Sequence, residues 1–346
     1  MNELVTEAAI ADAARLLDGV IVRTPLLATP WLSELVGGEI RLKCENLQRA
    51  GAFKIRGAYT ALARLTTDQR ARGVIAYSSG NHAQGVALAA LLFGVPAVVV
   101  MPTTSPIVKR EGARRLGAEV ILEGTTSLER QRRAETEAAD RGLTIVPAFD
   151  HSDIIAGQGT IGVEILDEWP EVDTILAPVG GGGMLSGVAA WVKRKHPACT
   201  VIGVEPENAD AMARSLAAGE PVTIEPRPTI ADGLMPVRPG DLTFAHVQAF
   251  ADGIVRVSDD AIADAAMRLL AIGKLVVEFS GAATVAALLS GEVRTDGHRI
   301  AAVVSGGNLD ARKALDLIDA GARNDRDAGL EGEAVAVAGA PPGADS

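Results

Sequence analysis

Four short loops in this sequence combine residue types that could act together on one small ligand. The first contains Lys54, which follows Phe53 directly and precedes a helical pattern that starts at Ile55. A lysine in such a partly apolar setting is often a surface cation whose stem lies along its neighbours. It can also be a desolvated amine with a lowered pKa that forms a Schiff base with a carbonyl compound. Lys54 alone does not decide between the two.

The second loop, SSGNHAQG (78–85), follows the strand pattern VIAYS and opens a helical pattern. Backbone N–H groups at a helix N-terminus, with the positive end of the helix dipole behind them, are suited to bind a carboxylate or a phosphate. The alternative is an ordinary helix cap made by Ser79 or Asn81, with His82 packed as any helical residue.

The third loop, PVGGGGMLSG (178–187), joins the strand pattern DTILAPV to a helical pattern. Consecutive glycines carry a large conformational cost, which indicates close approach of the backbone to a ligand, here a phosphate. The dinucleotide fingerprint fails because its last glycine position falls on Ser186, and no Gly-Lys-Ser/Thr follows. Glu205 nevertheless stands about where a dinucleotide-binding fold places its ribose acid. The loop therefore indicates a phosphate without naming the compound.

The fourth loop, VVSGGN (303–308), ends another strand pattern at Ser305, and a simple turn is its alternative reading. Taken together, the loops offer an amine beside an aromatic ring, a phosphate site, a carboxylate site and a strand-end hydroxyl. A phosphorylated aldehyde cofactor and an amino acid would use all of them. The sequence therefore predicts pyridoxal phosphate chemistry.

The elements that must position these loops follow one pattern. Strand-like runs such as 74–79, 96–102 and 173–179 are apolar throughout, and a helical run follows each. This is typical of parallel sheets covered by helices on both faces and joined by right-handed crossovers. One series occupies about residues 50–145 and another about 173–310. We therefore expect an α/β fold with two open parallel sheets.

The composition limits the class of protein. The chain has 346 residues, 48% of them hydrophobic, and a net charge of −11, which argues against a nucleic-acid partner. Two cysteines cannot form a disulfide framework, so a reducing cytoplasm is expected. The longest apolar run, 86–101, is too short to cross a membrane, and the acidic N-terminus does not resemble a signal peptide. Residues 325–346 are rich in Gly, Ala, Pro and acids, which predicts a disordered tail.

A series of motifs follows one order along nearly the whole chain: TPLLATPWLSE, KCENLQRAGAFKIRGA, SSGNHAQGVALAA, GGGGMLSG, GVEPENA, TIADGL, VVEFSGAA and SGGNLD. In these motifs the chain resembles the fold-type II pyridoxal-phosphate enzymes of the threonine/serine dehydratase and serine racemase family. The resemblance implies a tryptophan synthase β-like fold with the cofactor in the cleft between two domains. The implied large domain comprises residues 1–49 and 146–324, and the small, mobile domain comprises residues 50–145.

The resemblance also implies a role for each loop. Lys54 would hold the cofactor covalently and remove the substrate Cα proton, with Phe53 against the cofactor ring. Asn81 would bind the ring hydroxyl, and Ser305 would face the pyridine nitrogen with Glu278 nearby. The phosphate would be bound by the backbone of Gly180, Gly181, Gly182, Gly183 and Met184. The substrate would be bound by Ser78, Ser79, Gly80, Asn81 and His82.

The implied activity is that of an ammonia-lyase, which converts a β-hydroxy amino acid such as L-threonine or L-serine to a 2-oxo acid and ammonia. Racemisation of serine or aspartate is an alternative, because Ser79 stands where serine racemases carry a second acid/base. The segment VVEFSGAA departs from the usual threonine dehydratase pattern, so 3-hydroxyaspartate or a hydroxyectoine-pathway compound is another possible substrate. A NAD-dependent oxidoreductase or a nucleotide-binding module would rest on the glycine loop and Glu205 alone.

A divalent metal and partner chains complete these expectations. The resemblance implies a site for Mg²⁺ or Ca²⁺ at Glu205 and the carbonyl of Ala209, but its third carboxylate position falls on Ala211, and Asp210 is out of register. Such cations prefer several oxygen ligands. We expect a homodimer or homotetramer that binds a small amino acid and neither nucleic acid nor membrane.

Overall fold

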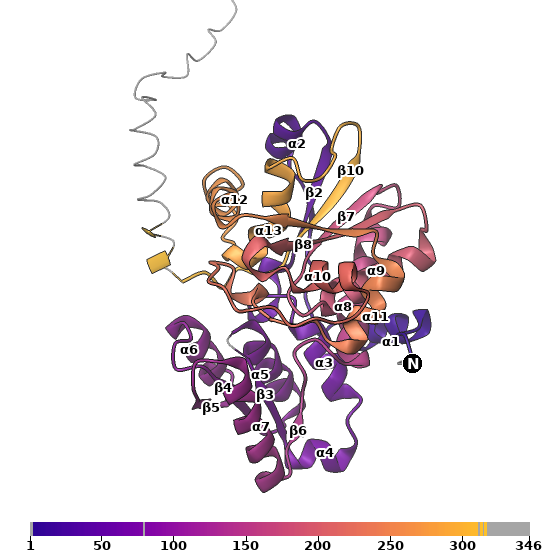
Figure 1. The fold of residues 1–346 in the computed structure, drawn as a ribbon. Coiled ribbons are helices and arrows are strands. Elements are labelled where there is room, and N and C mark those ends of the chain that lie inside the picture. The colour runs from indigo at the N-terminus through magenta and orange to yellow at the C-terminus, as the bar shows by residue number, and fades with distance from the viewer. Residues whose placement is uncertain (1–2, 79, 311, 314, 317–346) are drawn as a thin grey trace, which may run out of the picture. The chain divides into compact units, whose positions relative to one another are not determined.

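Two sheets organise the computed structural model, which describes residues 3–78, 80–310, 312–313 and 315–316 (Figure 1). The larger sheet has the strand order β1-β2-β10-β7-β8-β9. Its first two strands pair antiparallel and its other pairings are parallel. Its strands are β1 (Leu26–Ala28), β2 (Glu39–Cys44), β7 (Thr174–Pro178), β8 (Thr200–Pro206), β9 (Gly253–Val257) and β10 (Arg299–Val304).

The smaller sheet has the strand order β5-β4-β3-β6, and all its pairings are parallel. Its strands are β3 (Val74–Tyr77), β4 (Ala97–Met101), β5 (Glu119–Leu122) and β6 (Thr144–Ile145). The predicted α/β fold with two parallel sheets is therefore confirmed.

Helices connect the strands of both sheets (Figure 1). Those that precede or join the strands of the smaller sheet are α3 (Ile55–Ala63), α4 (Thr67–Arg72), α5 (Asn81–Phe93), α6 (Ile107–Arg115) and α7 (Ser127–Arg141). The others are α1 (Glu7–Leu17), α2 (Pro30–Val36), α8 (Ser152–Glu168), α9 (Gly183–Lys195), α10 (Ala211–Ala218), α11 (Asp241–Phe250), α12 (Asp259–Ala271) and α13 (Phe279–Leu289). No helix in the described part of the chain is long and apolar enough to cross a membrane.

The central strands of the smaller sheet, β3 and β4, are apolar along most of their length because helices cover both faces. Neighbouring residues of β4 point to opposite faces. Val99 packs in one buried cluster with Val86 of α5, whereas Val98 packs in another with Ala134 of α7. Side chains on one face of β4 therefore pack against α5, and those on the other face pack against α7.

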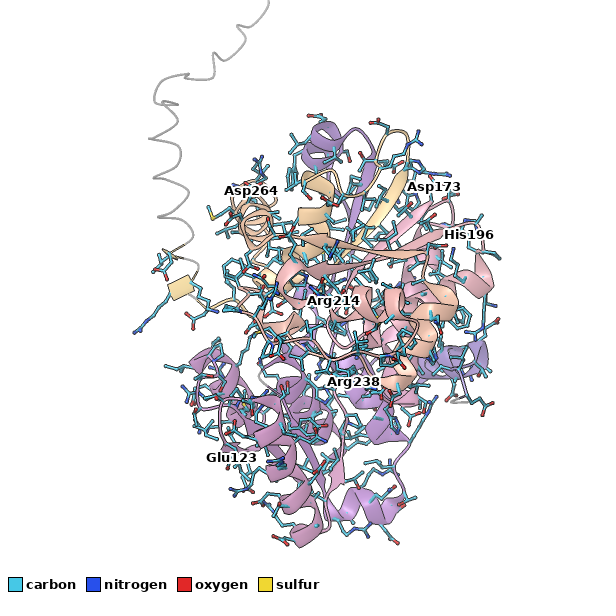
Figure 2. All side chains as sticks on the ribbon, in the orientation of Figure 1. Glu123, Asp173, His196, Arg214, Arg238 and Asp264 are labelled. Carbon is cyan, nitrogen blue, oxygen red and sulfur yellow. The ribbon has the colours of Figure 1, made fainter. Side chains whose placement is uncertain are left out.

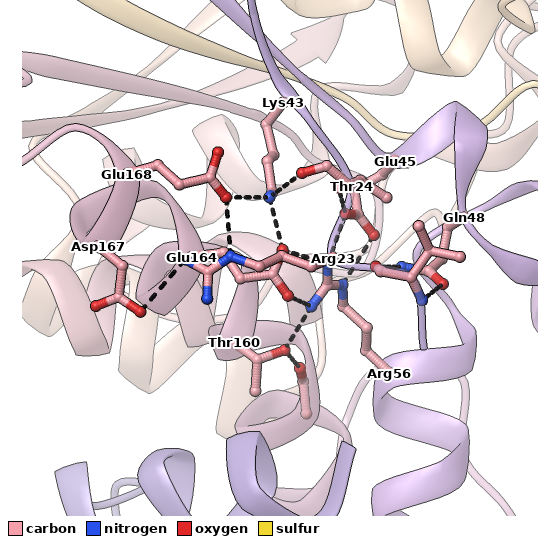
Figure 3. A network of polar contacts seen from close by, with 12 residues as sticks. Arg23, Thr24, Lys43, Glu45, Gln48, Arg56, Thr160, Glu164, Asp167 and Glu168 are labelled. Atoms are coloured by element: carbon pink, nitrogen blue, oxygen red, sulfur yellow. Dashed lines mark hydrogen bonds and ion pairs between the residues drawn. The ribbon is translucent and has the colours of Figure 1, made fainter. Parts of the chain in front are cut away.

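A buried network of charges joins β2, α3 and α8 (Figure 3). The Arg56 guanidinium, 0% exposed, donates to both oxygens of Glu45 and of Glu164 at 2.7–2.9 Å. Lys43 Nζ lies 2.6 Å from Glu164 Oε2 and also donates to the Thr24 carbonyl. Because every buried charge has an opposite partner, the network holds the first turn of α3 in place.

The division into two domains remains a proposal. All strands of the smaller sheet lie within residues 50–145, and those of the larger sheet lie within 1–49 and 146–324. Residues 1–310 nevertheless form one compact unit, and α3 contacts both α5 and α8. The tail predicted at 325–346 lies outside the described residues.

Candidate active site

Lys54 lies where the segment before α3 meets the end of β10. Ala52 and Gly306 form an isolated antiparallel bridge, and the Phe53 N–H donates to the Ser305 carbonyl at 3.2 Å. Lys54 is the cap of α3. The pairing therefore brings Phe53, Lys54 and Ser305 together, although about 250 residues separate the two segments in the sequence.

The Lys54 amine is half-buried and has no carboxylate partner among the described residues. Its Nζ donates to the Ala148 carbonyl at 2.9 Å and lies 5.0 Å from the centre of the Phe53 ring. Burial lowers the pKa of Lys54 to about 8. A substantial fraction of this amine is therefore neutral slightly above neutral pH, and the neutral amine can attack a carbonyl carbon.

The glycine loop joins β7 to α9, and its backbone donors are unused. Gly181, Gly182, Gly183 and Met184 are buried, and their N–H groups have no acceptor in the described part of the chain. Gly182 has φ +95°, a left-handed conformation that favours glycine. Buried donors without acceptors are costly, and the dipole of α9 adds positive potential, so the loop fits a phosphate.

Phe149 connects the glycine loop to the lysine. A Cβ on Gly181 would lie 2.3 Å from the Phe149 ring, and Thr243 Oγ1 donates to the Gly181 carbonyl at 2.7 Å. Phe149 directly follows Ala148, whose carbonyl accepts from Lys54. The Lys54 amine and the free donors of the glycine loop thus lie on either side of residues 148–149, an arrangement that fits a compound with both an aldehyde and a phosphate.

The start of α5 provides a second set of free donors. The N–H groups of Asn81 and His82 have no acceptor in the described part of the chain, while the Gly80 N–H donates to Ser78 Oγ at 3.2 Å. Ser79 lies outside the described residues, so its expected role stays a prediction. Two backbone N–H groups of the predicted carboxylate site therefore have no acceptor among the described residues and can donate to a ligand.

Asn81 joins the ends of α5, α13 and β10 through its side chain. Its Nδ2 donates to Glu278 Oε1, and its Oδ1 accepts from Asn308 Nδ2 at 3.0 Å. Glu278 is 3% exposed, and its N–H donates to the Gly306 carbonyl, next to Ser305. Asn81, Glu278 and Ser305, which the sequence predicted around the cofactor ring, are thus brought together.

His82 is neutral in this site. Burial first, and the nearby Lys54 cation second, lower the pKa of His82 to about 3. Its Nε2 lies 3.0 Å from the Val146 carbonyl, which only accepts, so Nε2 carries the hydrogen. His82 Nδ1 is buried and has no partner among the described residues. His82 therefore offers the site an acceptor rather than a charge.

The residues expected to bind a metal do not fit one. Glu205 Oε1 and Oε2 accept the N–H groups of Met212 and Ala213 in the first turn of α10, both at 2.9 Å. Burial raises the pKa of Glu205 to about 8. In the described part of the chain, no three His, Cys, Asp or Glu side chains could hold a metal ion together.

The neighbouring Asp210 is also fully engaged. Its Oδ1 accepts from Arg214, labelled in Figure 2, at 2.7 Å, and its Oδ2 accepts from Arg256 at 3.2 Å. All four carboxylate oxygens of Glu205 and Asp210 thus have donors from the protein. A divalent cation at Glu205 and Ala209 would have to compete with these donors for the carboxylate oxygens.

Some residues of the site had no assigned role in the sequence analysis. Asn308 lies within the motif SGGNLD, so that motif could have indicated it. Phe149 and Thr243 contact the glycine loop from other elements, and no local pattern marks them. Such contacts depend on how α8 and α11 pack on the larger sheet.

Known proteins match the chain along most of its length. The profile of the pyridoxal-phosphate dependent enzymes matches residues 17–306. The chain is 46% identical over 318 residues to the L-threonine ammonia-lyase of Thermotoga maritima, covering 92% of this chain and 79% of that protein. It is 40% identical to the L-threo-3-hydroxyaspartate ammonia-lyase of a Pseudomonas species, covering 89% and 97%. The structure of maize serine racemase superposes with a TM-score of 0.88 and 36% identity, covering 94% and 100%.

Proposed function

Because the chain belongs to the family of pyridoxal-phosphate-dependent enzymes, we propose that it is an ammonia-lyase for a β-hydroxy amino acid such as L-threonine or L-serine. The observation that carries the proposal is the Lys54 amine with its lowered pKa, hydrogen-bonded to Ala148, next to Phe149 and the glycine loop whose buried N–H groups have no acceptor among the described residues. The similarity to a threonine and a hydroxyaspartate ammonia-lyase supports this reaction class.

We assign the cofactor contacts to residues on both sides of Ala148. Lys54 Nζ would hold the cofactor covalently, and the backbone of Gly180 to Gly183 and Met184 would bind its phosphate. Phe53 would lie against the ring, while Asn81, Glu278 and Ser305 would interact with its polar atoms. Pyridoxal phosphate, when bound, supplies a group that stabilises negative charge at the substrate Cα.

Different residues of this chain then act on different groups of the substrate. The N–H groups of Asn81 and His82, and that of Gly80 once it leaves Ser78 Oγ, bind the substrate carboxylate, with Ser78 and Ser79 next to them. Once the substrate amine has displaced Lys54 from the cofactor, the freed Lys54 amine, when neutral, would accept the proton from Cα. The β-hydroxyl leaves with a proton as water, and a later water releases the nitrogen as ammonia. The net change converts L-threonine to 2-oxobutanoate and ammonia without an oxidant.

Two alternatives stay within the same family. The 40% identity to a hydroxyaspartate lyase favours a substrate with a second carboxylate, and the similarity to maize serine racemase favours inversion at Cα. In the second case Ser79 would be the acid/base on the opposite face. Chiral analysis of the remaining amino acid separates racemisation from elimination.

The test begins with the visible absorbance of the purified protein with pyridoxal phosphate. L-Threonine, L-serine and L-threo-3-hydroxyaspartate are then added separately, and 2-oxo acid and ammonia are measured. We expect both products in equal amounts from at least one substrate, and neither product with Lys54→Ala. An absorbance band without 2-oxo acid from any of the three would reject the lyase assignment, and no band would reject the cofactor.

We also propose that the enzyme works in the cytoplasm as a homodimer or homotetramer. Its cysteines, Cys44 and Cys199, are free and buried, which suits a reducing compartment. Light scattering of the purified protein measures the number of copies, and a monomer would reject the assembly.

A further inference from the structure

Lys109 of α6 reaches two loops of the larger sheet, although no sequence motif points to it. Its Nζ donates to Asp232 Oδ2 at 2.8 Å, in the short helix η4 (Asp232–Leu234), and lies 3.1 Å from Glu278 Oε2. Its side chain is only 4% exposed. Burial favours the neutral amine, but Glu278 and Asp232 outweigh it and raise the pKa of Lys109 above its usual range. Lys109 is therefore charged.

The same side chain lies against Gly80, the cap of α5. A Cβ on Gly80 would be 2.5 Å from Lys109 Cδ and 3.2 Å from Nζ. Only glycine leaves room for the lysine stem at this point. The dipole of α5 repels a cation at its N-terminus, so the two carboxylates rather than the helix keep the ammonium there.

Lys109 also acts on the next residue through Glu278. Glu278 Oε1 accepts from Asn81 Nδ2, while its Oε2 faces the lysine. Lys109 thus supports Gly80 by contact, and it supports Asn81 by holding the Glu278 carboxylate that accepts from the Asn81 amide.

We propose that Lys109 is a positioning residue that sets the start of α5 for binding of the substrate carboxylate. The proposal rests on the proposed function, in which Gly80, Asn81 and His82 bind that carboxylate. Within the described residues, the ion-pair partners of Lys109 are Asp232 and Glu278, not Lys54 or the glycine loop. Loss of the lysine therefore weakens binding of the amino acid, while Lys54 and the glycine loop still hold the cofactor.

The test compares Lys109→Met, which keeps the stem and removes the charge, with the wild-type holoenzyme. We expect the KM for L-threonine to rise about 10- to 100-fold, the range for losing a hydrogen bond to a charged group. The change in kcat should be smaller, and the variant should retain the cofactor, measured by its absorbance after gel filtration. Asp232→Asn should raise the KM in the same direction, and the double variant should be little worse than Lys109→Met because the two side chains act as a pair.

Lys193→Met is the matched control. Lys193 also forms an ion pair, 2.7 Å from Asp252, but at the far end of α9 from the glycine loop. Its KM should stay at the wild-type value. Hydrogen exchange provides a readout besides activity: the backbone amides of the first turn of α5 should exchange faster in Lys109→Met and not in Lys193→Met.

An unchanged KM in both Lys109→Met and Asp232→Asn would overturn the proposal, as would equal loss of cofactor in both lysine variants. Where Lys109→Met does not fold, Asp232→Asn carries the KM test, because the Asp232 side chain is 26% exposed. If wild type makes no 2-oxo acid, the proposed function fails, and unchanged exchange at α5 would then overturn the role of Lys109 separately.

Discussion

At the scale of single residues, burial distinguishes Lys54 from an ordinary surface lysine. An exposed lysine stays protonated at neutral pH, whereas burial lowers the pKa of Lys54 to about 8 without a carboxylate to oppose the change. The pKa of Lys109, which is more deeply buried, is instead raised by Glu278 and Asp232. Two lysines of one site thus differ in charge state because of their partners.

This difference predicts how cofactor attachment depends on pH. Only the neutral amine attacks the aldehyde, so we expect the attachment rate to the cofactor-free protein to rise about tenfold per pH unit below the Lys54 pKa and to level off above it. The growth of visible absorbance after mixing with pyridoxal phosphate measures this rate. Lys54→Ala should show no growth, and a rate independent of pH across this range would contradict the assignment.

The glycine loop gives a second prediction at this scale. An alanine at Gly181 would place its Cβ 2.3 Å from the Phe149 ring, so Gly181→Ala should move the loop. We expect a loss of about 1–3 kcal/mol in the free energy of unfolding, together with weaker binding of pyridoxal phosphate in a titration. Gly253→Ala is the control, because nothing lies within 4 Å of a Cβ there. Equal cofactor affinity in the two variants would show that the loop does not bind the phosphate.

At the scale of elements, the charge network around Arg56 holds α3, and therefore Lys54, against β2 and α8 (Figure 3). A Cβ on Gly157 of α8 would lie 2.6 Å from the Gly57 Cα of α3, so the two helices also touch along their backbones. The network and this close contact position Lys54 through α3, which follows it. The bridge between Ala52 and Gly306 positions Lys54 through the residues that precede it.

Removing the arginine should leave Glu45 and Glu164 buried without their partner. We expect Arg56→Met to lower the free energy of unfolding by about 3–5 kcal/mol, measured by denaturant unfolding. Arg299→Met, which removes the more exposed ion pair with Asp173, should cost only about 0–1 kcal/mol. Similar losses in both variants would show that burial does not strengthen the network.

The network also makes the free energy of unfolding depend on pH. Burial would raise the pKa of Glu164, but Arg56 and Lys43 outweigh it and lower the pKa below 4.5. The unfolded chain then binds the proton more readily than the folded chain. The contribution of Glu164 is therefore present above pH 4.5 and is lost as the pH falls through the folded pKa. Glu164→Gln should flatten this part of the stability profile.

The connection between β8 and α10 predicts that the folded chain does not depend on divalent cations. All four carboxylate oxygens of Glu205 and Asp210 already accept from backbone N–H groups or arginines. We expect the same thermal midpoint with a chelator, with Mg²⁺ or with Ca²⁺. Ala211→Asp, which adds the missing carboxylate, is the comparison variant. A midpoint that rises with either cation in the unaltered protein would contradict this prediction.

At the scale of the whole molecule, loops from both sheets meet at the proposed site. Ser78, Gly80 and the start of α5 come from the smaller sheet, whereas the glycine loop and Ser305 come from the larger one. Lys109 spans the two through its ion pairs with Asp232 and Glu278. Neither sheet alone holds both the proposed phosphate donors and the proposed carboxylate donors.

The sequence by itself determined the parallel sheets and the family. Parallel strands covered on both faces must be apolar throughout, and anion-binding loops must follow such strands and open helices, so both features are readable from neighbouring residues. For the same reason the predicted loops around Lys54, Asn81, Gly180 and Ser305 could be named in advance, although their roles remain predictions.

Only the tertiary structure decided which charges meet. Lys109 pairs with Asp232 across 123 positions and Asn81 with Glu278 across 197, and no local pattern encodes such contacts. Whether a metal can bind at Glu205 likewise depends on whether backbone N–H groups of α10 already donate to the Glu205 carboxylate. Charge state, donor satisfaction and close approach depend on three-dimensional neighbours, because burial and partner distance set their energies.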